Sequence, residues 1–146
     1  MSPLTLLDIQ DLHITYHGNR GTVPAVRGVD LTLEPGQTIG IAGESGCGKS
    51  TLAAAILRLL PPSTELTGKI LLDGDDVLNM KFGQLRAVRW TQAAIIFQGA
   101  MHALNPVHRI GDQIAEPILL HEKVSEKSAD NRVAELLDQV GLPPWR

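Results

Sequence analysis

The sequence predicts an α/β fold with an antiparallel β layer near the N-terminus, and three observations support this prediction. Apolar residues alternate with polar ones over residues 12–16 and again over residues 29–33, as in half-buried strands. A short apolar run at residues 38–42 leads into a glycine-rich loop. Residues 50–60 then carry apolar side chains at helical spacing, so the loop joins a strand to a helix. Strands and helices mixed in this way are typical of α/β domains.

The first half of the chain is predicted to contain two half-buried strands, one buried strand and one helix. The two alternating strands are marked by Leu12, Ile14 and Tyr16 and by Val29, Leu31 and Leu33. A loop at His17 to Gly21 separates them, and their closeness in sequence predicts an antiparallel pair. Thr38 to Ala42 has no polar face, as expected of a strand that is covered on both sides. The helix at Ser50 to Leu60 ends at Pro61-Pro62.

The second half is predicted to be mostly helical. The expected elements are, in order, a strand at Ile70 to Leu72, a tight turn at Asp73-Gly74, a short helix at Leu85 to Trp90, a buried strand at Ala94 to Phe97, a loop at Gly99 to Pro106, a helix through Ile110, Ile114 and Ile118, and a helix through Val133, Leu136, Leu137 and Val140. Pro117 is expected to kink the first long helix, while Gly141 and Pro143 stop the last one.

Size and composition indicate one ordinary globular domain. The chain has 146 residues, 43% of them hydrophobic and 20% charged. A formal net charge of −3 gives no global basic field, so nucleic acid is not an expected partner. Cys47 is the only cysteine, which excludes an internal disulfide and favours a reducing compartment. No secretory signal is visible at the N-terminus, and no stretch approaches the roughly 20 apolar residues of a membrane span.

The glycine-rich loop matches the phosphate-binding pattern G-x4-G-K-[ST] without a mismatch. Its residues are Gly43, Glu44, Ser45, Gly46, Cys47, Gly48, Lys49 and Ser50. Glycines let successive backbone N–H groups point inward, and the following helix adds its positive end. We expect Lys49 to reach the β- and γ-phosphates, the Ser50 hydroxyl to bind Mg²⁺ and Thr51 to donate to a phosphate oxygen. The loop therefore predicts a site for a polyphosphate bound with Mg²⁺.

Two other interpretations of this loop are less favoured. A merely flexible glycine turn does not explain why the pattern lies between a buried strand and a helix. A redox role for Cys47 lacks a neighbouring base or a second cysteine, so Cys47 is interpreted as a variable position of the loop.

With some 40 residues ahead of the loop, the chain resembles an ABC transporter ATPase. In that family an N-terminal β layer supplies an aromatic side chain that stacks on adenine, and Tyr16 is where this side chain is expected. Stacking needs only a flat π face, so the role is physically reasonable. The alternative is an ordinary half-exposed strand tyrosine, because aromatic residues are common in strands.

A glutamine at the end of the second buried strand adds to the resemblance. Ile95-Ile96-Phe97-Gln98 followed by a loop is similar to the Q-loop of ABC ATPases. The resemblance implies that the Gln98 side chain approaches Mg²⁺ and the attacking water, and that Lys49 and Gln98 are the residues acting in catalysis. The alternative is a capping or solvent-facing glutamine.

Two further segments are similar to the ATPases of peptide and nickel importers. They are Leu104-Asn105-Pro106-Val107 and the stretch Gly21 to Val29. The chain departs from that family at Gly99-Ala100, where Asp-Pro is usual, and this weakens the assignment of a substrate. The resemblance implies transmembrane permease subunits as partners through the Q-loop region, a second ATP-binding subunit, and indirectly a solute-binding protein. It also implies a peripheral location at the cytoplasmic face of the plasma (inner) membrane of a bacterium or archaeon.

Three parts of such an ATPase are missing from residues 1–146. There is no signature of the Leu-Ser-Gly-Gly-Gln type, no apolar strand ending in Asp-Glu and no switch histidine. The chain is therefore expected to be an incomplete nucleotide-binding domain that ends within the helical subdomain, to bind Mg-ATP weakly and not to hydrolyse it alone. Asp73 ends an apolar strand, but the following Gly74 indicates a turn and not a Mg²⁺ ligand.

Other classes of function remain open. A soluble ABC-type ATPase acting on nucleic acid or ribosomes would be expected to carry basic patches with aromatic residues. A small-molecule kinase would need an acceptor site and gives no reason for Tyr16. A non-catalytic remnant that only binds partners is the remaining alternative.

Overall fold

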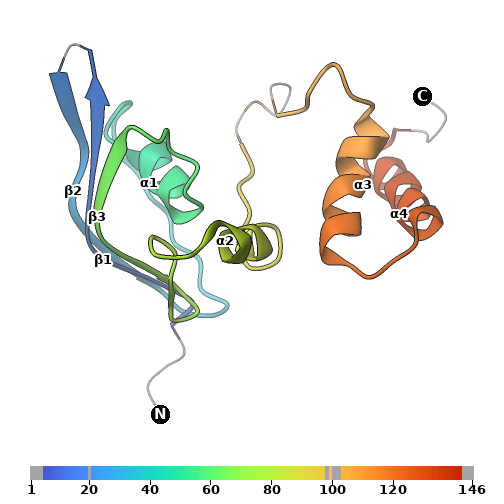
Figure 1. Ribbon diagram of the computed structural model, residues 1–146, viewed down its shortest axis with the longest axis horizontal. Coiled ribbons are helices and arrows are strands. Elements are labelled where there is room, and N and C mark those ends of the chain that lie inside the picture. The colour runs from blue at the N-terminus through green and yellow to red at the C-terminus, as the bar shows by residue number, and fades with distance from the viewer. Residues whose placement is uncertain (1–4, 20, 98, 100–102, 143–146) are drawn as a thin grey trace. The chain divides into compact units, whose positions relative to one another are not determined.

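The computed structural model describes residues 5–19, 21–97, 99 and 103–142. The chain divides into two compact units, residues 1–89 and residues 90–146, where composition predicted one domain. Figure 1 shows a sheet with two short helices in the first unit and two longer helices in the second.

The first unit is built on an antiparallel sheet of four strands. They are β1 (Leu7–Gly18), β2 (Gly21–Leu33), β3 (Thr64–Leu72) and the short β4 (Asp75–Asp76). Their order across the sheet is β2-β1-β3-β4, so β1 pairs on both edges. The predicted antiparallel layer is confirmed, and the strand predicted at residues 70–72 begins earlier, at Thr64.

A β-bulge in β1 changes which residues face the core. Leu7 and Ile9 are buried before the bulge, and Leu12 and Ile14 are buried after it. The register with both neighbouring strands shifts at this point, where Asp11 has a φ of 44°. The Asp11 N–H donates to the Asp30 carboxylate on β2 over 2.8 Å, which replaces a ladder bond. The extra residue therefore explains why the alternation seen at Leu12 and Ile14 does not extend unbroken to the start of the strand.

Both hairpins of the sheet are tight. Gly18 pairs with Gly21, so the loop predicted at residues 17–21 is shorter than expected. The turn at Asp73-Gly74 is confirmed, because both residues have positive φ (51° and 87°), as a type I′ turn requires. The carboxylate of Asp76 in β4 accepts from Leu78 N–H and from the Asn79 amide, at 3.0 and 2.7 Å.

Helix α1 (Lys49–Ile56) follows the phosphate loop and ends before the prolines that were expected to stop it. Arg58 adopts a φ of 49°, its N–H donates to the Ala55 carbonyl, and Leu59 N–H donates to the Ala54 carbonyl. This pair of bonds is a Schellman motif, which closes the helix one turn earlier than its apolar pattern indicated.

The C-terminal end of α1 is also held by an arginine. Arg89 directly follows α2 (Phe82–Val88), and its guanidinium donates to the Leu57 carbonyl at 2.7 and 3.1 Å and to the Arg58 carbonyl at 3.1 Å. A cation at the C-terminus of a helix complements the helix dipole. Arg89 therefore links the end of α2 to the C-terminal end of α1.

The second unit is a pair of packed helices, α3 (Ile110–His121) and α4 (Glu126–Gln139). Their contact is formed by the buried residues Ala115, Ala129 and Val133, with Ile114, Ile118 and Leu137 around them. Pro117 lies inside α3. Gly141 N–H donates to the Asp138 carbonyl and Leu142 N–H to the Leu137 carbonyl, so the predicted helix stop at Gly141 is confirmed, while Pro143 lies outside the described residues.

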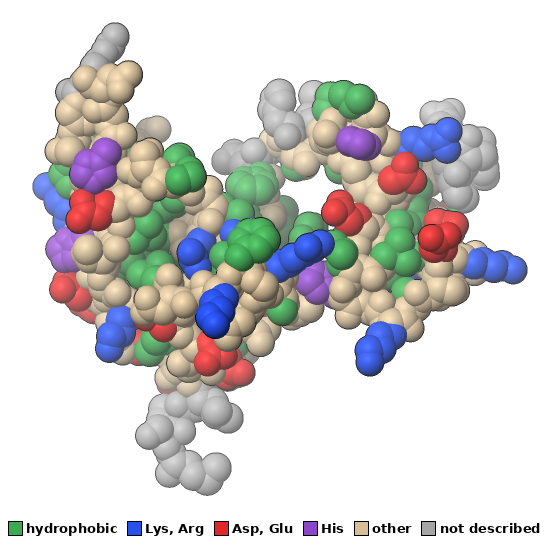
Figure 2. All heavy atoms as spheres, in the orientation of Figure 1, with side chains coloured by type: hydrophobic (Ala, Val, Ile, Leu, Met, Phe, Trp, Pro, Cys, Tyr) green, Lys and Arg blue, Asp and Glu red, His purple; other side chains and the backbone are tan. Residues whose placement is uncertain are grey.

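Two predicted buried strands are wrong. Residues 38–42 and 94–97 form no strand, and Ile41 and Ile96 are 52% and 98% exposed. A strand is stable only when its N–H and C=O groups pair with a neighbour, and no described strand pairs with either segment. Trp90, the predicted end of the short helix, is 69% exposed. Figure 2 shows hydrophobic side chains at the surface of both units.

Candidate phosphate-binding site

The phosphate loop is followed directly by helix α1, and the N-terminus of this helix has no capping side chain. Gly48 is the N-cap of α1, no side chain accepts from the first turn, and no acidic residue lies in that turn. The first helical bond runs from Leu52 N–H to the Gly48 carbonyl over 2.8 Å. The amides of residues 49–51 therefore have no partner within the helix and are suited to bind an anion.

Only glycine fits at the N-cap of this helix. Gly48 has a φ of 100°, and a Cβ at this position would lie 2.4 Å from the Ala25 carbonyl oxygen. The loop therefore lies close against the β2 backbone at Ala25. The glycine demanded by the motif is explained here by close approach as well as by backbone conformation.

The Lys49 ammonium lies over the loop that precedes it. Nζ donates to the Gly43 carbonyl at 2.8 Å and to the Glu44 carbonyl at 2.6 Å, and it is 3.4 Å from Cys47 Sγ. These bonds keep the positive charge beside the amides of the helix N-terminus. Lysine is a compact point charge of the kind that binds phosphates.

Two hydroxyls follow Lys49 and differ in their surroundings. The Ser50 side chain is exposed and forms no hydrogen bond with the described residues. Mg²⁺ is usually held by one or two protein ligands together with phosphate oxygens, so a free Ser50 hydroxyl fits that use. Thr51 is half-buried and its Oγ1 accepts from the Tyr16 hydroxyl at 3.2 Å. The loop, the ammonium and these hydroxyls together fit a metal-bound polyphosphate.

Tyr16 also borders a hollow at the end of the β1–β2 hairpin. The hollow has a volume of about 370 Å³ and is lined by Tyr16, His17, Gly18, Asn19, Gly21, Thr22 and Val23. Next to Tyr16, the His17 ring is 2.9 Å from the Glu65 carboxylate. Whether Tyr16 stacks on adenine stays a prediction. Gln98 lies outside the described residues, and its catalytic and metal-binding roles also stay predictions.

Two residues of this site were not found by sequence reasoning. Ala25 supports Gly48 through its carbonyl oxygen, a backbone group that any residue would supply. Arg89 holds the far end of α1 from 32 positions away, and nothing in the local pattern marks it. Neither contact has a sequence signal, because both depend on how the first unit folds.

Alkylation of Cys47 is expected to block nucleotide binding. Cys47 is exposed, it is the only cysteine, and its Sγ is 3.4 Å from Lys49 Nζ. A maleimide adduct would displace the ammonium, so ATP affinity should fall at least about tenfold, equivalent to about 1.4 kcal/mol. Titration calorimetry before and after treatment with N-ethylmaleimide measures the change. Cys47→Ala should bind ATP and be insensitive to the reagent; equal affinity of modified and unmodified chains would contradict the prediction.

Comparison with known families agrees with this geometry. Residues 26–146 match the family model described as "ABC transporter". The chain is 43% identical over 140 residues to the dipeptide transport ATP-binding protein DppD of Bacillus subtilis, covering 94% of this chain and 42% of that protein. It is 41% identical to the oligopeptide transport ATP-binding protein OppD of the same organism, with 94% and 39% covered. The probable D,D-dipeptide transport ATP-binding protein DdpD of Escherichia coli is 42% identical, with 94% and 43% covered.

Solved structures agree in fold. A dimeric post-hydrolysis structure of the ATP-binding cassette MJ0796 with ADP and Pi matches with a TM-score of 0.73 and 21% identity, over 93% of this chain and 57% of that chain. The expected α/β nucleotide-binding fold is thereby confirmed. The chain spans about two fifths of the length of the curated relatives it matches. Within the described residues, no helix combines the length and the apolar character needed to cross a membrane.

Proposed function

We propose, since this chain belongs to the ABC transporter family, that it is the nucleotide-binding part of an ATPase subunit that drives solute import. The observation that carries the proposal is the phosphate loop. An uncapped helix N-terminus, a glycine required by both its positive φ and its close approach to Ala25, and an ammonium over the loop coincide within residues 43–51. This set of groups is suited to a polyphosphate, and ATP is the nucleotide that the family name implies.

Peptides are the proposed class of transported solute. The relatives described above are named for dipeptide, oligopeptide and D,D-dipeptide transport, which supports peptides over nickel. The selecting contacts belong to membrane and solute-binding subunits, so the solute is a property of the complex. Uptake of a labelled dipeptide by cells with and without this gene tests the proposal, and unchanged uptake would contradict it.

We further propose that Lys49 and Ser50 hold the phosphates and Mg²⁺ of the bound nucleotide. The metal would neutralise charge on the β- and γ-phosphates, as in other phosphoryl-transfer sites. Lys49 would contribute positive charge beside the same oxygens, and the free amides of residues 49–51 would orient them. Gln98 would position the attacking water.

The chain alone is expected to bind Mg-ATP without turning it over. No strand ending in Asp-Glu and no Leu-Ser-Gly-Gly-Gln signature is present in the 146 residues, so neither the water nor the γ-phosphate gains these groups. A phosphate-release assay at saturating Mg-ATP should give a rate far below about 1 s⁻¹. Turnover within the usual range of about 1 to 100 s⁻¹ would contradict the prediction.

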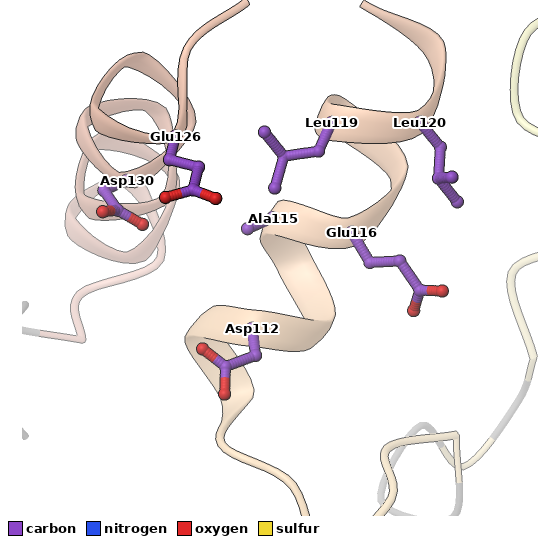
Figure 3. A pocket seen from close by; sticks show the side chains of 7 residues that line it. All are labelled: Asp112, Ala115, Glu116, Leu119, Leu120, Glu126 and Asp130. Atoms are coloured by element: carbon purple, nitrogen blue, oxygen red, sulfur yellow. The ribbon is translucent and has the colours of Figure 1, made fainter.

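Partner subunits are proposed to contact the region around α3. A hollow of about 460 Å³ between α3 and α4 is lined by Asp112, Ala115, Glu116, Leu119, Leu120, Glu126 and Asp130. Figure 3 shows Asp112, Ala115 and Leu119 on α3 facing Glu126 and Asp130 on α4. Leu119 and Leu120 are exposed, and among the described residues the carboxylates that line the hollow form no ion pair. These groups would suit a basic, amphipathic segment of a permease subunit. A second ATP-binding subunit and the cytoplasmic face of the inner membrane complete the proposed assembly.

Reversing charge in this hollow is expected to weaken the contact with the permease. Asp112→Lys combined with Glu126→Lys changes the charge of the hollow by four units, which should lower the amount of ATPase subunit retained by permease subunits about tenfold or more. Co-purification from membranes measures the retained amount. Glu135→Lys on α4 is the control, because Glu135 pairs with Arg132 and does not line the hollow. Equal retention of the unmodified subunit, the double variant and the Glu135→Lys control would show that the permease binds elsewhere.

A further inference from the structure

Tyr16 contacts helix α1. Neither the phosphate-loop motif nor stacking on adenine requires this contact. Tyr16 lies near the end of β1, and Thr51 is the third residue of α1. The Tyr16 hydroxyl donates to Thr51 Oγ1 over 3.2 Å, across 35 positions of sequence, and the bond is partly buried. This bond joins the β layer to the first turn of the helix that carries the phosphate-binding amides.

The direction of this hydrogen bond leaves the Thr51 proton free. A phenol is a more acidic hydroxyl than an alcohol, so Tyr16 is the better donor and Thr51 the acceptor. Threonine in a helix often donates to the carbonyl four residues earlier, which would use up its proton. Among the residues that the structure describes, the Thr51 hydroxyl donates to no acceptor. Its proton is therefore available to a ligand at the helix N-terminus.

We propose that Tyr16 is a positioning residue for phosphate binding, because its hydroxyl orients the Thr51 hydroxyl toward a phosphate oxygen of the nucleotide. The inference rests on the proposed nucleotide-binding function. Hydrogen bonds in a chain polarise one another, and an anionic acceptor at the end of the chain strengthens the bond that it accepts. The hydroxyl of Tyr16 thus acts on the phosphates, whereas stacking by its ring would act on the base. The two roles are chemically separable.

Tripolyphosphate distinguishes the role of the Tyr16 hydroxyl from the role of its ring, because this ligand has phosphates and no base. Tyr16→Phe keeps the ring and removes the donor, so it should weaken binding of ATP and of tripolyphosphate by the same factor, about fivefold. Tyr16→Ala removes ring and donor together. It should weaken tripolyphosphate as much as Tyr16→Phe does, and weaken ATP further if the ring stacks. Titration calorimetry on the 146-residue chain with both ligands measures these affinities.

A double-mutant cycle tests whether the effect passes through Thr51. Thr51→Val removes the hydroxyl, and adding Tyr16→Phe to this variant should cause no further loss of tripolyphosphate affinity. Thr51→Ser keeps a hydroxyl and should keep the fivefold dependence on Tyr16. A purely structural role of Tyr16 would persist in the Thr51→Val background and would lower the midpoint of thermal unfolding.

Two results would overturn the inference. One is tripolyphosphate affinity that is unchanged by Tyr16→Phe; the other is additive losses in the double variant. In both cases the unmodified chain still binds ATP and tripolyphosphate, so the proposed function survives. If the unmodified chain binds neither ligand, the proposed function fails and this inference fails with it.

Discussion

Replacing Lys49 by alanine is expected to weaken Mg-ATP binding about 100-fold. The ammonium is held over the loop by the carbonyl oxygens of Gly43 and Glu44, so its charge is already located where phosphates would bind. Hydrogen bonds to charged groups contribute about 1.5–3 kcal/mol each, and a loss of about 2.7 kcal/mol corresponds to a factor of 100. Titration calorimetry of the two chains with Mg-ATP measures the difference.

The matched control is Lys69→Ala, which removes the same charge from an exposed position in β3. It should leave the affinity within about twofold, because an exposed charge away from the loop is screened by salt. Lys49→Ala should change the free energy of unfolding by less than about 1 kcal/mol, since its bonds are to exposed loop carbonyls. Comparable ATP affinities of the Lys49 and Lys69 variants would show that the loop does not bind phosphates through Lys49.

Replacing Gly48 by alanine is expected to damage both the fold of the loop and its function. Its φ of 100° is unfavourable for any other residue, and the new Cβ would lie 2.4 Å from the Ala25 carbonyl oxygen. Strain and displacement together should lower the free energy of unfolding by about 2–4 kcal/mol. The amides of residues 49–51 would move with the loop, so ATP affinity should fall by about tenfold or more.

Alanine substitutions at two other glycines distinguish the cost of backbone strain from the cost of steric contact. Gly46 has a φ of 82° but no atom within 4 Å of a Cβ, so Gly46→Ala should cost only about 1–2 kcal/mol. Gly83 lies in α2 with open space around it, and Gly83→Ala should stabilise by up to about 1 kcal/mol. Chemical denaturation of the three variants measures their free energies of unfolding and so gives the order of their stabilities. A Gly48 variant as stable as the Gly46 variant would contradict the close approach to β2.

Local patterns in the sequence predicted the local parts of the fold. The alternation at Leu12 and Ile14, the Asp73-Gly74 turn and the helix stop at Gly141 all appear in the structure. Each depends on residues within a few positions of one another, where side-chain period and backbone preference decide the conformation. The loop that precedes α1 also appears in the structure, whereas phosphate binding by its residues stays a prediction.

Features that depend on distant partners were predicted wrongly or missed. Residues 38–42 and 94–97 are apolar enough for buried strands, but no described strand pairs with them. The bulge at Asp11 depends on a carboxylate from β2, and the support of α1 depends on Arg89. The bond between Tyr16 and Thr51 likewise crosses 35 positions. Period and composition carry no information on such pairings, which arise only when the sheet and the helices come together.

An amide chemical-shift titration of the isotope-labelled chain with Mg-ATP tests directly whether residues 43–51 bind the nucleotide. We expect saturable shifts that are largest at the amides of residues 46–51, where the helix N-terminus is uncapped and Lys49 lies over the loop. The same amides should respond to tripolyphosphate and remain unchanged in the Lys49→Ala chain at equal ligand concentration. Shifts that are absent from this loop, or that are centred on α3 and α4, would contradict the assignment of residues 43–51 as a nucleotide site.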